Sequence, residues 1–264
     1  MDEALIFIKL GGSLITYKDQ PETARPDIIE ASLQAMHKLR EQHPNLSILL
    51  GHGSGSFGHT LAKQYNTMDG VSTPADWLGF AEVAKAAKAL NDLVFEIGIK
   101  VGLPLQVFRP SALVLTRNRQ IITWDTSPIQ SALQQGRIPL VYGDVVVDTF
   151  LGGTILSTED LFLHLNESLK PSKMLIAGIE AGVYADFPIS SLVIPEISRE
   201  DPLSGFTLNG AHTPDVTGGM LAKVRLLQTA CAKNPGMSAF IYSGLAVENT
   251  SKIVSGQRIG TQIR

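Results

Sequence analysis

The stretch Leu5-Ile6-Phe7-Ile8-Lys9-Leu10-Gly11-Gly12-Ser13 decides the fold class. Its apolar run shows no alternation, which is typical of a strand covered on both faces. Two glycines follow at once, and glycines at a strand end let backbone N–H groups approach an anion closely. Lys9 lies on the strand, where it can aim a point charge at phosphate oxygens. The stretch therefore predicts a buried strand that ends in an anion-binding turn.

The same order of elements recurs along the chain. Further buried strands are predicted at Leu46–Leu50, Leu105–Phe108, Ile138–Tyr142, Met174–Ala177 and Ala239–Tyr242. Helices are predicted at Pro26–Gln42, Thr60–Tyr65, Ala75–Val101, Ser127–Gln135, Glu159–Leu169 and Gly218–Ala232. This alternation predicts an α/β fold with a mainly parallel central sheet covered by helices on both faces, which is a three-layer αβα sandwich.

The length of 264 residues, with 44% hydrophobic residues, suits one sizeable domain or two closely joined lobes. We expect an N-terminal lobe over residues 1–175 and a C-terminal lobe over residues 176–264, joined as one continuous domain. The Pro- and Ser-rich stretch Phe187–Asp201 predicts irregular structure or a hairpin.

Composition excludes several classes of protein. The formal net charge of −3 gives no electrostatic footprint for nucleic acid, so nucleic acid is not an expected partner. The single cysteine, Cys231, excludes an intrachain disulfide and is expected to be a small buried hydrophobe. The start Met1-Asp2-Glu3 lacks the features of a signal peptide, and no stretch approaches the roughly 20 apolar residues of a membrane span. We expect a cytoplasmic protein that does not enter a membrane.

A second glycine-rich turn, Gly51–His59, again follows a predicted strand and precedes a helical pattern. A helix N-terminus offers unpaired N–H groups and a partial positive charge to an anion. The turn is not a Walker A loop, because no Gly-Lys-Ser/Thr follows, and it fits the dinucleotide fingerprint poorly. His59 can donate to a phosphate oxygen or, alternatively, cap the helix at the surface. His52 is expected to be structural.

A third turn covers Asp215-Val216-Thr217-Gly218-Gly219 and leads to Lys223. Asp215 or Thr217 can cap the following helix, and the glycines leave room for a phosphate at its N-terminus. Lys223 lies one helical turn beyond Gly219 on the same face, so its side chain can reach the same phosphate. The alternative for Lys223 is a solvated surface lysine.

Three glycine-rich turns, two of them with lysines, are more than one nucleotide requires. They suit two phosphate-bearing ligands that meet head to head. Phosphoryl transfer needs this arrangement, because its catalysis rests on positioning and charge neutralisation with little covalent chemistry from the protein.

Together these residues resemble the amino acid kinase superfamily, whose members begin with a strand-borne lysine and Gly-Gly-Ser and carry a late Thr-Gly-Gly-Met-x-x-Lys. Within it the chain is similar to the family of isopentenyl phosphate kinases. The loop ending Ser56-Phe57-Gly58-His59 is the segment that best distinguishes this family from other members of the superfamily. The resemblance extends from Lys9 to the C-terminal segment and includes Ile8–Thr16, Lys18, His52–His59, Tyr142–Asp148 and Gly260–Ile263.

The resemblance implies an amino acid kinase-like fold and a phosphotransferase that uses ATP to phosphorylate isopentenyl phosphate, a step of isoprenoid biosynthesis. It also implies Mg²⁺ that is not held by protein ligands alone, and a homodimer built through the N-terminal lobe. Residues implied for ATP binding are Lys9, Gly11, Gly12, Ser13, Gly55, Gly219 and Lys223. Those implied for the acceptor phosphate are Ser54, Gly58, His59 and Gly153. The implied catalytic residues are Lys18, Lys9, His59 and Asp160, with Asp160 orienting the lysines.

The chain departs from the family pattern at three places. Gly53-Ser54-Gly55 stands where three glycines are usual, and Thr158-Glu159-Asp160 stands where Ser-Gly-Asp is usual. The segment Ile179–Tyr184 lacks both aspartates of the nucleotide-side Asp-x-Asp-Gly-Val-Tyr pattern, which leaves the nucleotide preference open.

Three other functions stay open at this point, of which another small-molecule kinase of the superfamily, such as an amino-acid kinase, is a weaker alternative. A fosfomycin-type phosphonate kinase of the same superfamily shares the histidine after the glycine loop, and only the pocket for the substrate tail can separate the two activities. Trp77, Phe80, Ala81 and Ala84 form an apolar stripe at helical spacing that either lines such a pocket or packs in the core. The more distant alternative is a non-catalytic ligand-binding domain, against which the retained lysines argue.

Overall fold

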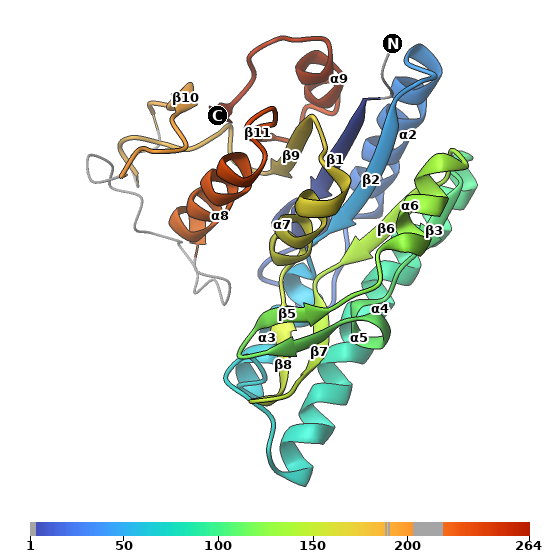
Figure 1. Ribbon diagram of the computed structural model, residues 1–264, viewed down its shortest axis with the longest axis vertical. Coiled ribbons are helices and arrows are strands. Elements are labelled where there is room, and N and C mark those ends of the chain that lie inside the picture. The colour runs from blue at the N-terminus through green and yellow to red at the C-terminus, as the bar shows by residue number, and fades with distance from the viewer. Residues whose placement is uncertain (1–3, 188, 190, 203–218) are drawn as a thin grey trace.

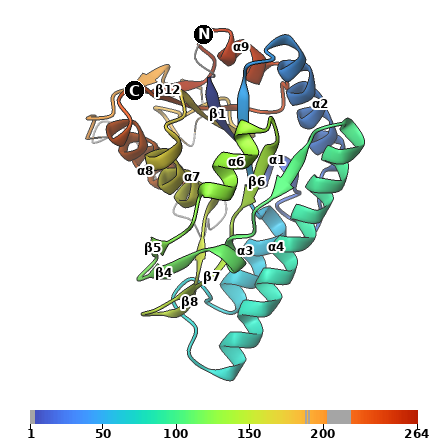
Figure 2. The same ribbon diagram turned by 45° about the vertical axis from the view of Figure 1, so that its right-hand side comes forward.

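A computed structural model describes residues 4–187, 189, 191–202 and 219–264. The elements of the described chain form a large twisted sheet with helices on both sides and a smaller sheet at one end (Figures 1 and 2). The helices are α1 (Gly12–Ile15), α2 (Pro26–Gln42), α3 (Gly55–Gln64), α4 (Pro74–Val101), α5 (Pro110–Leu113), α6 (Ser127–Gln134), α7 (Thr158–Leu169), α8 (Gly219–Lys233) and α9 (Asn249–Val254).

The large sheet has eight strands within the described residues. Their spatial order is β10 (Glu196–Ile197), β12 (Thr261–Ile263), β11 (Ser238–Ser243), β9 (Lys173–Gly178), β1 (Leu5–Leu10), β2 (Ser47–His52), β6 (Ile138–Tyr142) and β3 (Leu105–Val107). All neighbours pair in parallel except β11 and β12. The predicted fold class is confirmed, because the central strands and long helices lie within one or two residues of their expected bounds.

Successive side chains of β1 point to opposite faces of the sheet and so contribute to two separate apolar layers. Ile6 and Ile8 face the layer formed with α2 and α4, whereas Phe7 faces the layer formed with α6, α7 and α8. Successive side chains of a strand point to opposite faces, so Lys9 shares the face of Phe7. The first strand therefore sends its lysine toward α7.

Helix α4 is the longest helix of the described chain and has clear end signals. Thr73 and Asp76 form a capping box, Pro74 occupies the first turn, and Gly102 ends the helix in the left-handed conformation with φ 91°. These signals explain why the sequence predicted its limits so closely. No helix in the described part of the chain is long and apolar enough to cross a membrane.

A second sheet of the described chain was missed by the sequence analysis. It contains β5 (Gln120–Thr123), β4 (Leu115–Arg117), β7 (Asp144–Asp148) and β8 (Gly152–Leu156), in that spatial order. Its strands are short, and β4 and β5 are partly exposed, so they lack the long apolar runs that marked the central strands. In Figures 1 and 2 this sheet lies beside α3 and α4, away from α8 and α9.

Strand β9 contains the expected boundary between the two lobes, at residues 175 and 176, and lies between β1 and β11 inside the large sheet. The division into lobes therefore remains a prediction. The prediction for Cys231 is confirmed, because its side chain is buried in the core and burial raises its pKa to about 11. Between Phe187 and Asp201, the described residues form only the short strand β10 and a bridge from Tyr184 to Val193, as expected of irregular structure.

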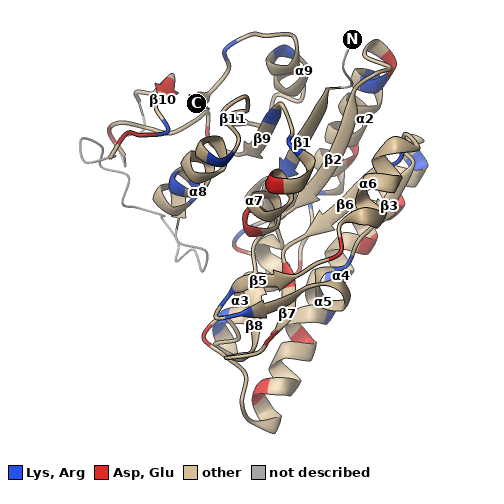
Figure 3. Cartoon of the chain, in the orientation of Figure 1, with Lys and Arg blue, Asp and Glu red and all other residues tan. Residues whose placement is uncertain are grey.

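Lys and Arg residues are interspersed with Asp and Glu residues along the described chain (Figure 3). One buried carboxylate, that of Asp148, ties the two hairpins of the small sheet together. It accepts hydrogen bonds at 2.8–3.0 Å from Thr116 Oγ1 and from the N–H groups of Asn118, Arg119, Phe150 and Leu151. Burial alone would raise the pKa of Asp148, but these donors outweigh burial and hold the pKa well below its usual range.

Asp148→Asn is expected to lower the free energy of unfolding by about 1.5–3 kcal/mol, because the hairpins lose bonds to a charged acceptor. A depressed pKa contributes stability that is present above the unfolded-state value of about 4 and is lost as the pH falls below it. The difference between wild type and variant, measured by urea unfolding, should therefore be full at pH 7 and shrink below pH about 4. The control is Asp125→Asn, which alters a surface carboxylate that accepts a hydrogen bond from the Ser127 N–H group. An equal loss in both variants at every pH would contradict this account.

Candidate active site

A cavity of about 600 Å³ opens at the carboxyl ends of the central parallel strands. Such ends meet at one edge of a parallel sheet, and ligands of open α/β sheets bind there. The cavity contains most of the residues expected at the site: Lys9, Gly11, Gly12, Ser13, Lys18, Ser54, Gly55, Gly58, His59, Gly219 and Lys223. Residues from both ends of the chain are thus brought together.

The first two glycine-rich turns touch each other. A Cβ built on Gly12 would lie 2.4 Å from the Gly55 nitrogen, and one built on Gly53 would lie 2.8 Å from the Gly12 nitrogen. Gly55 also has φ +49°, and a Cβ there would lie 2.2 Å from Thr16 Oγ1. Only glycine allows this approach, which follows from the parallel pairing of β1 and β2.

Free backbone donors are concentrated where the turns meet. Within the described part of the chain, the N–H groups of Gly12, Ser13 and Gly55 donate to no acceptor, as is normal in the first turn of a helix. The Ser56 N–H instead donates to Thr16 Oγ1 at 3.0 Å. The arrangement forms two adjacent cradles for anions, one on each turn.

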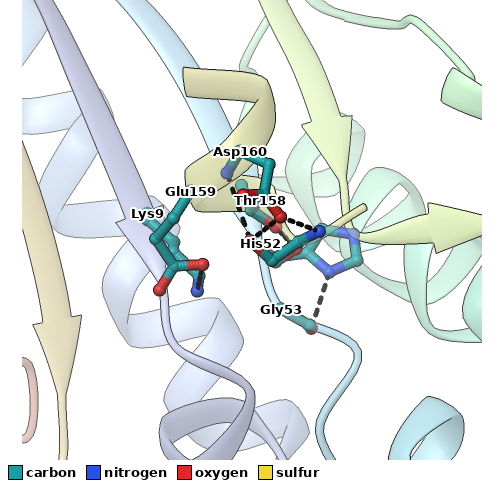
Figure 4. Close-up of polar contacts among 7 residues, drawn as sticks. Lys9, His52, Gly53, Thr158, Glu159 and Asp160 are labelled. Atoms are coloured by element: carbon teal, nitrogen blue, oxygen red, sulfur yellow. Dashed lines mark hydrogen bonds and ion pairs between the residues drawn. The ribbon is translucent and has the colours of Figure 1, made fainter. Parts of the chain in front are cut away.

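Lys9 lies against Glu159 at the base of the cavity (Figure 4), where the two side chains form a buried ion pair. Both residues are at most 7% exposed. Burial alone would raise the pKa of Glu159, but the charges of Lys9 and then Lys223 outweigh it and hold the pKa below its ordinary value. Glu159 is therefore the carboxylate that pairs with Lys9, and the charge of Lys223 also acts on it.

This finding corrects the role expected of Asp160. The Asp160 carboxylate accepts from Ser157 N at 2.9 Å and from Ser157 Oγ at 2.7 Å, while Asp160 N donates back to Ser157 Oγ at 3.1 Å. These bonds are a capping box at the start of α7. Asp160 thus fixes the helix end, and the preceding residue turns toward Lys9. The sequence showed both carboxylates, but only the cap geometry decides which one faces the lysines.

Lys18 and His59 reach the cavity from different elements. Lys18 lies on the exposed segment after α1, which folds back through the bridge from Thr16 to Ala24. His59 lies on α3, directly after Gly58, and is half-buried. A Cβ on Gly58 would lie 2.4 Å from Ser54 Oγ, so the Ser54 side chain packs over that glycine.

The third turn is described only in part. Its residues Asp215–Gly218 lie outside the described residues, so the expected helix cap at Asp215 or Thr217 is not placed. Gly219, with φ +69°, opens α8, and Lys223 lies one turn further on. Both line the cavity.

Gly153 does not join this group. A Cβ on Gly153 would lie 2.8 Å from the Phe80 ring and 3.0 Å from Val71, so this glycine allows close packing between β8 and α4. Gly153 is not among the described residues that line the cavity. Its expected role at the acceptor phosphate therefore remains a prediction.

The apolar end of the cavity is formed by residues that the sequence analysis missed. It is lined by Ala62, Met68, Val83, Ala87 and Ile155. Of the expected stripe, Phe80 packs on Gly153 and Trp77 is 42% exposed. Phe80 and Ala84 pack against the apolar cluster of Ala62, Val83 and Val145, which is the core-packing alternative for the expected stripe. Ile155 of the unpredicted small sheet packs against the same cluster.

The cavity is also lined by Ile179, Glu180, Tyr184 and Phe187. These residues occupy the segment after β9 that lacks the usual aspartates. Among the described residues, no group of three or more His, Cys, Asp or Glu side chains is placed to hold a metal ion.

A family model described as the Amino acid kinase family matches residues 4–243. The chain belongs to the amino acid kinase family. Its relatives in that family include the isopentenyl phosphate kinase of Methanothermobacter thermautotrophicus, which is 31% identical over 98% of both chains. The isopentenyl phosphate kinase of Haloferax volcanii is also 31% identical, over 99% of both chains. The resemblance seen in the sequence is confirmed.

Solved structures agree with these relatives. X-ray structures of an isopentenyl phosphate kinase are 28% identical to this chain, with a TM-score of 0.83 and coverage of 98% of this chain and 100% of the other. As a member of a kinase family, the chain is a phosphotransferase, which disfavours the non-catalytic alternative.

Glu159→Gln is expected to lower the stability of the protein without ATP by up to about 3 kcal/mol, because it leaves the buried Lys9 charge without its carboxylate. Bound ATP should restore part of the loss, since phosphate oxygens supply negative charge to the lysines. Melting temperatures with and without saturating MgATP measure both effects.

The matched control is Glu167→Gln, which breaks the surface pair with Lys233 and should cost less than about 1 kcal/mol. A loss in Glu159→Gln that is no larger than in Glu167→Gln would show that the buried pair does not organise the site.

Proposed function

We propose that this enzyme transfers the γ-phosphoryl group of ATP to isopentenyl phosphate, giving isopentenyl diphosphate and ADP. The observation that carries the proposal is the cavity itself: two anion cradles meet at Gly12 and Gly55, and an apolar end continues beyond the second cradle. The relatives named isopentenyl phosphate kinase support the same substrate.

In this proposal the first cradle binds the ATP phosphates. The amides of Gly12 and Ser13 donate to phosphate oxygens, and Lys9 and Lys223 neutralise their charge. Glu159 holds the ammonium group of Lys9 in position. Gly11, Gly55 and Gly219 leave room for the backbone to approach the nucleotide.

The second cradle binds the acceptor phosphate. The turn around Ser54 and Gly58 surrounds it, and His59 donates a ring N–H to one of its oxygens. Lys18, which enters from the segment after α1, would stabilise the charge that develops on the transferring phosphoryl group. An acceptor phosphate is already an anion, so no buried general base is required.

Mg²⁺ fits this site as a companion of ATP. The ion would be held mainly by phosphate oxygens and water, as is usual for Mg²⁺ at nucleotide sites, and it would reduce the negative charge between the two phosphate groups. We also propose a cytoplasmic homodimer, as the family resemblance implies.

A fosfomycin-type phosphonate kinase would need a cavity suited to a small polar epoxide. Val83, Ala87 and Ile155 instead present carbon atoms at the end of the cavity, which favours a branched apolar tail. The apolar lining thus separates two acceptors that the anion site cannot distinguish.

A substrate panel with MgATP tests the proposal. ADP release and ³¹P spectra should show a diphosphate product from isopentenyl phosphate, and far slower turnover of fosfomycin or amino acids. Efficient turnover of fosfomycin or an amino acid, with none of isopentenyl phosphate, would overturn it.

His59→Ala should weaken the acceptor and leave ATP binding almost unchanged. Loss of one charge-assisted hydrogen bond predicts a decrease in kcat/KM for the acceptor by about ten- to a hundredfold, which corresponds to about 1.5–3 kcal/mol. His59→Gln, which keeps a donor, should recover part of it. Separate titrations of ATP and acceptor decide the matter: a collapse of ATP affinity with normal acceptor affinity would reverse the assignment of the two cradles.

A further inference from the structure

Two buried polar residues outside the cavity contact each other behind the second cradle. His52 Nε2 lies 3.2 Å from Asn91 Oδ1, and these residues are 0% and 2% exposed. His52 ends β2, whereas Asn91 lies in the middle of α4. Neither His52 nor Asn91 is among the described residues that line the cavity, so the pair has no direct part in binding.

His52 holds the peptide on which the second cradle begins. Its Nδ1 lies 3.1 Å from the Gly53 carbonyl oxygen (Figure 4), and the Gly53 N–H donates to the Leu10 oxygen at 3.0 Å. The ring also stacks on Tyr142, with centroids 5.4 Å apart and planes 4° apart. The N–H group and the carbonyl group of Gly53, which belong to two successive peptide planes, are thus both anchored before the chain enters the cradle.

The direction of the bonds follows from the charge of the ring. Burial lowers the pKa of His52 to about 4, so the ring is neutral at neutral pH and carries one N–H. A carbonyl oxygen can only accept, so Nδ1 is the donor to Gly53. Nε2 must then accept, which places the NH₂ group of Asn91 toward the ring, in the alternative orientation of the amide.

Asn91 connects this anchor to the apolar end of the cavity. Val83, Ala87 and Asn91 follow one another at intervals of four residues, so they share one face of α4. The first two residues line the apolar end, and the third contacts His52. A single rigid helix therefore bears both the tail pocket and the support of the acceptor-phosphate cradle.

We infer that His52 and Asn91 are a positioning pair that fixes the distance between the acceptor-phosphate cradle and the apolar tail pocket. The inference rests on the proposed function. A ligand with a phosphate at one end and a branched apolar tail at the other gains from both sites only when their spacing matches its length. The pair thus converts tail binding into correct placement of the phosphate.

The test compares isopentenyl phosphate with ethyl phosphate, which offers the same phosphate and almost no tail. Asn91→Leu keeps the side-chain volume and removes the bond to His52. The ratio of kcat/KM for isopentenyl phosphate to that for ethyl phosphate should fall by about tenfold or more, since displacement of about 1 Å has effects of this size. The KM for ATP should stay within about twofold, because the first cradle keeps its supports.

Val94→Ala, at a fully buried position of α4 beyond Asn91, is the control for general loss of stability. It should lower the melting temperature and leave the ratio unchanged. A wild-type ratio in Asn91→Leu would overturn the inference, whereas failure of the wild-type enzyme to use isopentenyl phosphate would overturn the proposed function and the inference with it.

Two variants of His52 separate its bonds and provide a second test if Asn91→Leu does not fold. His52→Gln places an amide near the former Nε2 and keeps the link to Asn91, whereas His52→Asn places one near the former Nδ1 and keeps only the link to Gly53. The ratio should be closer to that of wild type in His52→Gln. The opposite order would show that the Gly53 anchor alone matters and that α4 does not set the spacing.

Discussion

The site depends on a charge buried at the centre of a parallel sheet. Lys9 projects from β1 into the cavity, where Glu159 on α7 lies against it. A buried ammonium group without a carboxylate would be costly, so α7 must begin where it does and present that side chain. The capping box of Ser157 and Asp160 fixes this beginning. One ion pair thus links the first strand to the start of α7.

The second constraint is the lack of space between the two glycine turns. Parallel pairing of β1 and β2 places both turns at one edge, and the contact between Gly12 and Gly55 leaves no room for a Cβ. Backbone N–H groups from separate turns therefore face a common space. In the proposed reaction, two phosphates bound there would lie close enough for in-line transfer, and Lys9, Lys18 and Lys223 would neutralise the charge between them.

Much of the fold and the anion site could be predicted from the sequence, because both depend on local signals. Apolar runs without alternation marked the central strands, and glycines at their ends marked the turns. The tail pocket could not be predicted in the same way. Trp77 and Phe80 satisfied the helical spacing as well as Val83 and Ala87 did, and periodicity alone does not say which face of a helix a neighbouring sheet will cover.

By itself, the sequence determined the order in which strands and helices follow one another along the chain. It also determined the positions of the glycine turns and the presence of lysines beside them. These properties follow from local periodicity and from the conformational freedom of glycine. Only the tertiary structure decided between Glu159 and Asp160 as the partner of Lys9, and between Gly153 and its neighbours as part of the cavity wall. Adjacent residues of a helix differ in direction by about 100°. A one-residue choice therefore decides whether a carboxylate caps a helix or faces a lysine, and it is settled by packing between segments far apart in the chain.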